Sequence, residues 1–180
     1  METSLSADDL RILHLLQHDA KLTNKEIADK LGKSVTPVYE RIKKLEEDGY
    51  IKRYVAILDK RMINMSLIAY AHVQLKEHSQ AMLRSFEKEA VKFYEVMECY
   101  HMTGQFDYLL KVVIRDMDAY HDFMMHKLAT LPNIGVVQTF FVMSEAKQET
   151  AYPLQQQESK DEKKRRKPGI RSSGRNRNGL

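Results

Sequence analysis

Cys99 and His101 are the first residues whose types and spacing could do chemistry. Cys99 is the one cysteine of the chain, and His101 follows two positions later in a segment typical of a strand. A Cys–His nucleophile pair needs hydrogen-bond contact and a third group that orients the imidazole. Residues i and i+2 of a strand share a face without converging, and no third group is evident. We therefore expect no catalytic residue and no enzyme.

A metal or cofactor site is also not expected. His14 and His18 are four residues apart on a predicted helix, a spacing that could suit a metal. No cysteine, glutamate or third histidine lies nearby in the sequence, so ordinary polar helix surface is the better interpretation. The chain also lacks a Gly-rich phosphate loop.

The stretch from Thr23 to Ile51 is the strongest functional signal. Thr23-Asn-Lys-Glu26 is a capping box that opens a helix, and Gly32 follows where a helix end tolerates positive φ. Ser34 can cap a second helix, in which Val38, Ile42 and Leu45 recur at helical spacing. Two helices joined by a short Gly-containing turn are the helix-turn-helix layout, preceded here by a helix over residues 7–18.

In that layout the second helix enters the major groove of double-stranded DNA. Its first turns would face base edges, and its basic side chains would reach phosphates. The ribbon over residues 50–58 would form a wing beside the duplex. The expected DNA-binding residues are Ser34, Val35, Thr36, Tyr39, Glu40, Arg41, Lys43, Lys44 and Arg53.

The rest of the folded chain predicts a second domain of the α+β class. Residues 67–75, 93–102, 106–114 and 134–143 are strand-like, and residues 80–90 and 118–130 are helical. This order is the ferredoxin-like βαββαβ plan, with both helices on one face of an antiparallel sheet. We expect a DNA-binding domain over 1–58, a linker over 59–65, the second domain over 66–154 and a tail over 155–180.

The uncovered sheet face predicts a partner surface. Apolar residues on it would be an aggregation liability if exposed, and a second copy of the chain is the simplest cover. A dimer would present two recognition helices to two half-sites. The residues assigned to this face are Ile68, Tyr70, His72, Tyr94, Val96, Cys99, Leu109, Val112, Phe140 and Val142.

Sequence composition indicates where in the cell the protein is expected and which residues carry its net positive charge. The N-terminus lacks the basic start and apolar run of a signal peptide, and no segment suits a membrane span. With a single cysteine, we expect a cytoplasmic, nucleoid-associated protein without a membrane partner. The formal charge of +4 comes from residues 160–177, whose KKRRK run is either a phosphate-binding arm or a solubilising tail.

Two motifs at the right distance resemble one family. The segment TNKEIADKLGKSVTPVYERIKKLEEDGYIKRYVAILD is similar to the helix-turn-helix of Lrp/AsnC regulators. ECYHMTGQFDYLLKVVIRD and LPNIGVVQTFFVMSEAK resemble the later strands of that family, so the similarity covers about residues 5–154. It implies a transcription factor with a winged helix-turn-helix and a RAM/ACT-like effector domain. Homodimers, tetramers or octamers are implied as well.

The resemblance also implies a small effector, usually an amino acid. Carried over by position, the effector residues are Tyr100, His101, Thr103, Gly104, Gln105, Phe106, Asp107, Gln138 and Thr139. Gln105 and Val137 depart from the family pattern, which puts the choice of ligand in doubt. Chemically, the turn N–H groups at Gly104 could hold a carboxylate and Asp107 an ammonium.

Two alternatives remain open at this point. The segment from Thr103 to Asp107 could be an ordinary tight turn, with Asp107 as a turn residue. The protein could also organise the nucleoid by wrapping DNA through phosphate contacts, without any effector.

Overall fold

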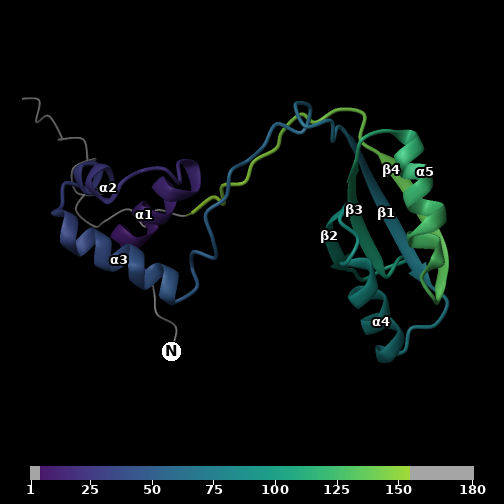
Figure 1. Cartoon of the computed structure of the whole chain (residues 1–180). Helices are drawn as coiled ribbons and strands as arrows, with labels where there is room; N and C mark the ends of the chain where they lie inside the picture. The colour runs from purple at the N-terminus through teal and green to yellow at the C-terminus, as the bar shows by residue number, and fades with distance from the viewer. Residues whose placement is uncertain (1–4, 155–180) are drawn as a thin grey trace, which may run out of the picture. The chain divides into compact units, whose positions relative to one another are not determined.

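The computed structural model describes residues 5–154 (Figure 1), so the expected basic tail lies outside the described residues. Within this range, residues 5–55 and 149–154 form one compact unit and residues 56–148 form another. Gln17 ties the last described residues to the first unit. Its side-chain amide donates to the Tyr152 carbonyl and accepts from the Tyr152 N–H, both at 2.9 Å.

The first unit is built from three helices, α1 (Ala7–His18), α2 (Asn24–Leu31) and α3 (Val35–Glu47). The expected capping box opens α2 at Thr23, a second box opens α1 at Ser6, and Gly32 ends α2 with φ of 66°. All three helices contribute to one apolar core, because their apolar residues recur at helical spacing. Its fully buried members include Ile12, Ile27, Ala28 and Val38.

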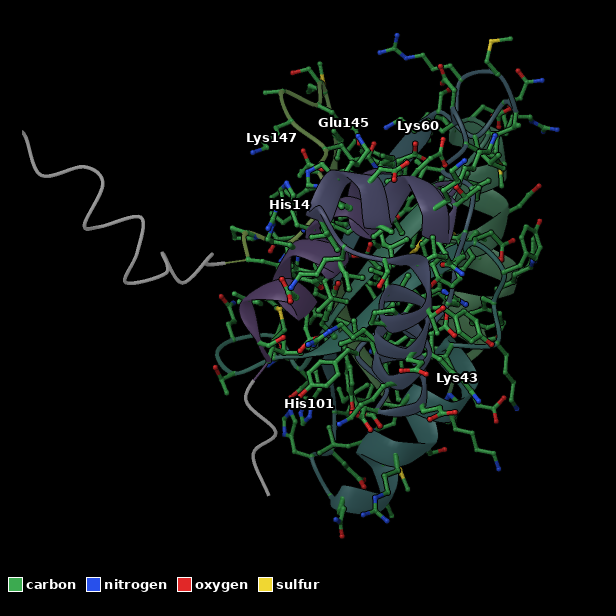
Figure 2. All side chains as sticks on the ribbon, turned by 90° about the vertical axis from the view of Figure 1, so that its left-hand side faces the viewer. His14, Lys43, Lys60, His101, Glu145 and Lys147 are labelled. Atoms are coloured by element: carbon green, nitrogen blue, oxygen red, sulfur yellow. The ribbon has the colours of Figure 1, made fainter. Side chains whose placement is uncertain are left out.

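The second unit is a four-stranded antiparallel sheet with helices. Its elements are β1 (Leu67–Leu75), α4 (Gln80–Ala90), β2 (Val96–His101), β3 (Tyr108–Ile114), α5 (Met117–His126), the 3₁₀ helix η1 (Leu128–Thr130) and β4 (Ile134–Phe141). The strand order β2-β3-β1-β4 is that of the ferredoxin-like fold, which confirms the predicted fold class. The segments flanking the sheet are joined by an ion pair between Lys60 and Glu145 (Figure 2).

Helices α4 and α5 cover one face of this sheet. Phe86 of α4 and Phe123 of α5 pack with Ala71, Val73 and Leu110 from the central strands in one buried cluster. Alternation along the strands then leaves the other face without a helix. We call this second side the open face. Tyr70, His72, Leu109, Gln138 and Phe140 belong to it by strand register.

Three residues assigned to the open face lie on the other side of the sheet, and a fourth, Tyr94, lies in the turn before β2. Val112, Val96 and Cys99 belong to the helix-covered side: Val112 is fully buried in the core, and the other two pack against it. Val112 is three positions from Leu109 on the regular strand β3, so the two residues lie on opposite faces. For β2 the reason is an irregularity near Met97, where the register changes so that Val96 pairs with Val112 but Glu98 pairs with Lys111. An extra residue of this kind reverses the alternation of side chains.

Several element ends also differ from the predicted ones. The strands β2 and β3 start later than expected, and the helix predicted over residues 118–130 breaks at Lys127 into α5 and η1. Residues 50–58, expected as a wing ribbon, have no strand pairing in the structure. This segment therefore forms neither a helix nor a strand in the described chain.

Candidate functional site

Helix α3 presents the candidate DNA-binding surface. Its buried stripe of Val38, Ile42 and Leu45 turns the opposite side outward. The expected contact residues on that side are all exposed: Ser34, Val35, Thr36, Tyr39, Glu40, Lys43 and Lys44. The first turn therefore combines hydroxyl, methyl and aromatic groups, which are suited to base edges.

Ser34 occupies the N-cap position of α3 without acting as a cap. Its backbone is extended, as a cap requires, but its side chain makes no capping hydrogen bond. Ser6 and Thr23, by contrast, make the side-chain bonds of their boxes. Pro37 lies in the first turn, where a missing N–H has little cost, so α3 tolerates a weak cap.

Arg41 is held by the start of α1. Its Nη1 lies 2.9 Å from Asp9 Oδ1 and 3.1 Å from Ser6 Oγ, and its Nη2 is 4.0 Å from Asp8. Burial alone would raise the pKa of the Asp9 carboxyl, but hydrogen bonds from Ser6 and Arg41 outweigh it and lower that pKa. Sequence reasoning missed Asp9 because its contact with Arg41 spans 32 positions.

Other cations of this unit are also paired with acids. Lys33 contacts Asp8 at 2.8 Å, and Lys43 lies 3.6 Å from Glu47 one turn further along α3. Exposed pairs of this kind are weak and screened by salt, so phosphates can compete for these cations. Arg53 is exposed in the extended segment after α3.

The candidate effector loop joins β2 to β3. The Met102 N–H donates to the Asp107 carbonyl at 2.8 Å and closes the loop, while Gly104 has φ of 121°. That conformation is rare for other residues. Thr103 and Gln105 are exposed, whereas Phe106 packs its ring 5.4 Å from that of His72.

Asp107 faces inward and ties this loop to the end of β1. Its Oδ2 accepts from the Leu75 N–H at 2.7 Å and lies 3.1 Å from His78 Nε2. Its own N–H donates to the Val73 carbonyl at 2.9 Å. These contacts favour the structural interpretation of Asp107, and they identify His78 as a polar neighbour that sequence reasoning did not include.

The remaining expected effector residues lie on two different faces. Tyr100, Leu109, His72 and Gln138 form one row across the open face. His101 instead stacks on Tyr108, and the Thr139 hydroxyl lies 2.5 Å from the Tyr120 hydroxyl on the helix-covered side. Tyr100 and Gln138 are also three strand spacings apart, or about 14 Å. These residues do not form one pocket within a single chain.

His72 is a further polar group on the open face that sequence reasoning treated as part of an apolar surface. It lies between the rings of Phe106 and Phe140, which is 5.3 Å away. Its Nδ1 is buried and has no hydrogen-bond partner among the described residues. The His72 imidazole is therefore held on this face by contacts with the two aromatic rings.

The structure offers little for catalysis or metal binding. Burial, followed by the nearby Glu87, raises the pKa of the Cys99 thiol, which opposes formation of a nucleophilic thiolate. Residues 5–154 contain no group of three or more His, Cys, Asp or Glu side chains that could hold a metal ion. In the same range, no helix is long and apolar enough to cross a membrane.

Comparisons with known proteins match both units. Residues 9–52 match the family model for winged helix-turn-helix DNA-binding, and residues 68–152 match that for the Lrp/AsnC ligand binding domain. The Bkd operon transcriptional regulator of Pseudomonas aeruginosa is 34% identical, over 81% of this chain and 95% of its own length. The leucine-responsive regulatory protein of Escherichia coli is 35% identical, over 78% and 85%.

Solved structures show the same similarity. A transcriptional regulator of Neisseria meningitidis in complex with L-Met superposes with a TM-score of 0.80 at 32% identity, over 84% of this chain and 97% of the other. An AsnC family regulator of Agrobacterium tumefaciens gives 0.79 at 38% identity, over 83% and 97%. Both of these proteins are regulators of transcription.

Proposed function

Because the chain belongs to the Lrp/AsnC family of DNA-binding transcriptional regulators, we propose that it recognises specific double-stranded DNA and that an amino acid modulates this binding. The observation that carries the proposal is the exposed first turn of α3 on a capped helix-turn-helix. Val35, Thr36 and Tyr39 read base edges in this proposal, and Arg41, Lys43 and Lys44 contact phosphates.

The reading unit is a homodimer, which can assemble further into tetramers or octamers. The open face supports this part of the proposal, because Val136 and Phe140 on it are about half exposed. A second copy would cover these side chains and bring a second α3 to the next half-site.

The effector site is completed by a neighbouring copy. Tyr100 and Gln138 are too far apart to hold one small molecule between them, so each would contribute to a separate shared pocket with the Thr103–Asp107 loop of another chain. The complex of the Neisseria regulator with L-Met supports an amino acid as the ligand class. Gly104 and its neighbouring N–H groups would contact the carboxylate.

Selection of bound sequences from a random duplex pool tests the DNA-binding proposal. A recurrent motif with two half-sites is the expected result, since each dimer presents two α3 helices. Binding that spreads over many helical turns without sequence preference would instead favour the nucleoid-organising alternative. The length of the protected region in a footprint separates these two outcomes.

Thermal shift with each of the common amino acids tests the effector. A ligand that binds only the native protein raises its melting temperature. Gln138→Ala should weaken that shift, whereas its neighbour Thr139→Val should lower the melting temperature without changing the shift. Absence of a shift with every amino acid would remove this ligand class from the proposal.

A further inference from the structure

The contact between Asp9 and Arg41 joins the start of α1 to the proposed DNA-binding helix. The two Asp9 oxygens have different partners. Oδ2 accepts from the Ser6 N–H at 2.9 Å and from the Ser6 hydroxyl at 2.5 Å, whereas Oδ1 accepts from Arg41 Nη1 at 2.9 Å. The capping box thus fixes the carboxylate, and the carboxylate fixes the guanidinium.

Arg41 remains accessible although it is held. Its side chain is 42% exposed, compared with 18% for Asp9. A guanidinium has five N–H donors in a planar fork, and Asp9 and Ser6 use only the Nη1 group within hydrogen-bond distance. Nη2 lies 4.0 Å from Asp8, beyond hydrogen-bond distance, so the other donors can contact an anion while the Asp9 bond persists.

We propose that Asp9 is a positioning residue for DNA binding: it holds Arg41 so that the outer edge of the guanidinium meets a backbone phosphate. This inference rests on the proposed phosphate contact of Arg41. A long, flexible side chain loses rotamer freedom when it binds, and one that is already fixed loses less. Asp9 itself stays out of contact with the DNA.

If Asp9 positions Arg41, its removal should weaken DNA binding, whereas an effect of net charge alone would strengthen DNA binding. Asp9 is negative, so its removal should strengthen attraction to DNA if only net charge matters. The same increase would follow if Asp9 merely competed with phosphate for Arg41. Positioning predicts the reverse, because a free Arg41 must be ordered before it can bind.

The test compares Asp9→Ala, Arg41→Ala and the double variant by fluorescence anisotropy on a short random-sequence duplex at several salt concentrations. Asp29→Ala is the matched control, since it removes the same charge from an exposed site on α2. Each single variant at Asp9 or Arg41 should lose affinity roughly tenfold. The slope of log affinity against log salt should fall by about one per DNA-binding unit.

The double variant and the control separate the possible outcomes. With Arg41 already removed, Asp9→Ala should cause no further loss. The positioning role would be overturned if Asp9→Ala binds DNA as tightly as Asp29→Ala, or more tightly, and its salt slope is unchanged. If Arg41→Ala has no effect, the phosphate contact itself fails, and with it that part of the proposed function.

Loss of the capping box could reduce the folded fraction and imitate the effect. Asp9→Glu addresses this, because glutamate suits the box and keeps the charge. It should bind DNA more tightly than Asp9→Ala and retain the wild-type salt slope. Melting curves for every variant establish that binding is measured on folded protein; a slope for Asp9→Glu that matches Asp9→Ala would count against the proposal.

Discussion

Single aspartates connect distant parts of each unit. Asp107 accepts from the Leu75 N–H and contacts His78, residues 32 and 29 positions away. Its side chain is only 18% exposed. A buried N–H that loses its acceptor is costly, so the role of Asp107 is structural whether or not its other oxygen meets a ligand.

Replacement of Asp107 should therefore destabilise the protein. Asp107→Ala should cost about 2 kcal/mol in the free energy of unfolding, the usual value of a hydrogen bond to a charged group. Asp107→Asn keeps an acceptor for Leu75 and should cost less. His78→Ala removes only an exposed pair and should stay within about 0.5 kcal/mol. Urea denaturation measures the unfolding free energy of all three variants. Equal losses for Asp107→Ala and His78→Ala would contradict the structural role of Asp107.

The Asp9 carboxyl makes stability depend on pH in a defined direction. Its pKa in the folded protein lies below the ordinary value of 3.8. Its contribution is therefore fully present above that value and is lost as the pH falls through the folded pKa. The difference in unfolding free energy between wild type and Asp9→Asn should be constant near neutral pH and shrink in acid. A difference that grows on acidification would contradict this assignment.

At the scale of elements, the helix starts of the first unit differ in how they are capped. The Thr23 hydroxyl oxygen accepts from the Glu26 N–H at 3.2 Å, and the Glu26 carboxylate accepts from the Thr23 N–H at 2.8 Å. Ser34 makes no such bond before α3. The α2 start is thus stabilised locally, while the Ser34 side chain can serve another purpose.

This difference predicts unequal effects of two similar substitutions. Thr23→Ala should cost about 1 kcal/mol of stability, the usual value of a side-chain cap. Ser34→Ala should cost close to nothing, yet it should weaken DNA binding if its hydroxyl contacts the duplex. Thermal melts together with anisotropy separate these effects. A loss of stability at Ser34 as large as that at Thr23 would refute the assignment.

At the scale of the whole molecule, the open face governs assembly. It combines apolar residues such as Phe140 with polar ones such as His72. No helix among the described residues of one chain packs on this face. The helix-turn-helix from Thr23 to Ile51 carries six Lys/Arg and six Asp/Glu, so its net charge is zero and a single copy should bind DNA weakly. Two linked copies would gain affinity by acting together.

A charge on the open face should separate the copies. Phe140→Asp places a carboxylate on an apolar side chain that is 51% exposed, and it should give a monomer in sedimentation velocity. Affinity for a duplex with two half-sites should fall by about 100-fold. Met125→Asp is the matched control, since Met125 on α5 is 54% exposed. A Phe140→Asp protein that remains dimeric would exclude this face as the interface.

Sequence alone determined the features that depend on nearby residues. The capping boxes at Ser6 and Thr23, the turn at Gly32 and the strand from Leu67 to Leu75 arise from spacings of two to four residues. The predicted fold class followed from the order of such elements and is confirmed. Family membership followed from motifs that are themselves continuous in the chain.

Tertiary structure decided which side chains meet. It packed Cys99 against the core, turned Asp107 toward Leu75, joined Arg41 to Asp9 and separated Tyr100 from Gln138. Each of these outcomes depends on strand register or on helices packed across many positions. A local pattern does not encode register when one irregular residue reverses a strand's faces, and it does not encode pairing between residues 30 positions apart.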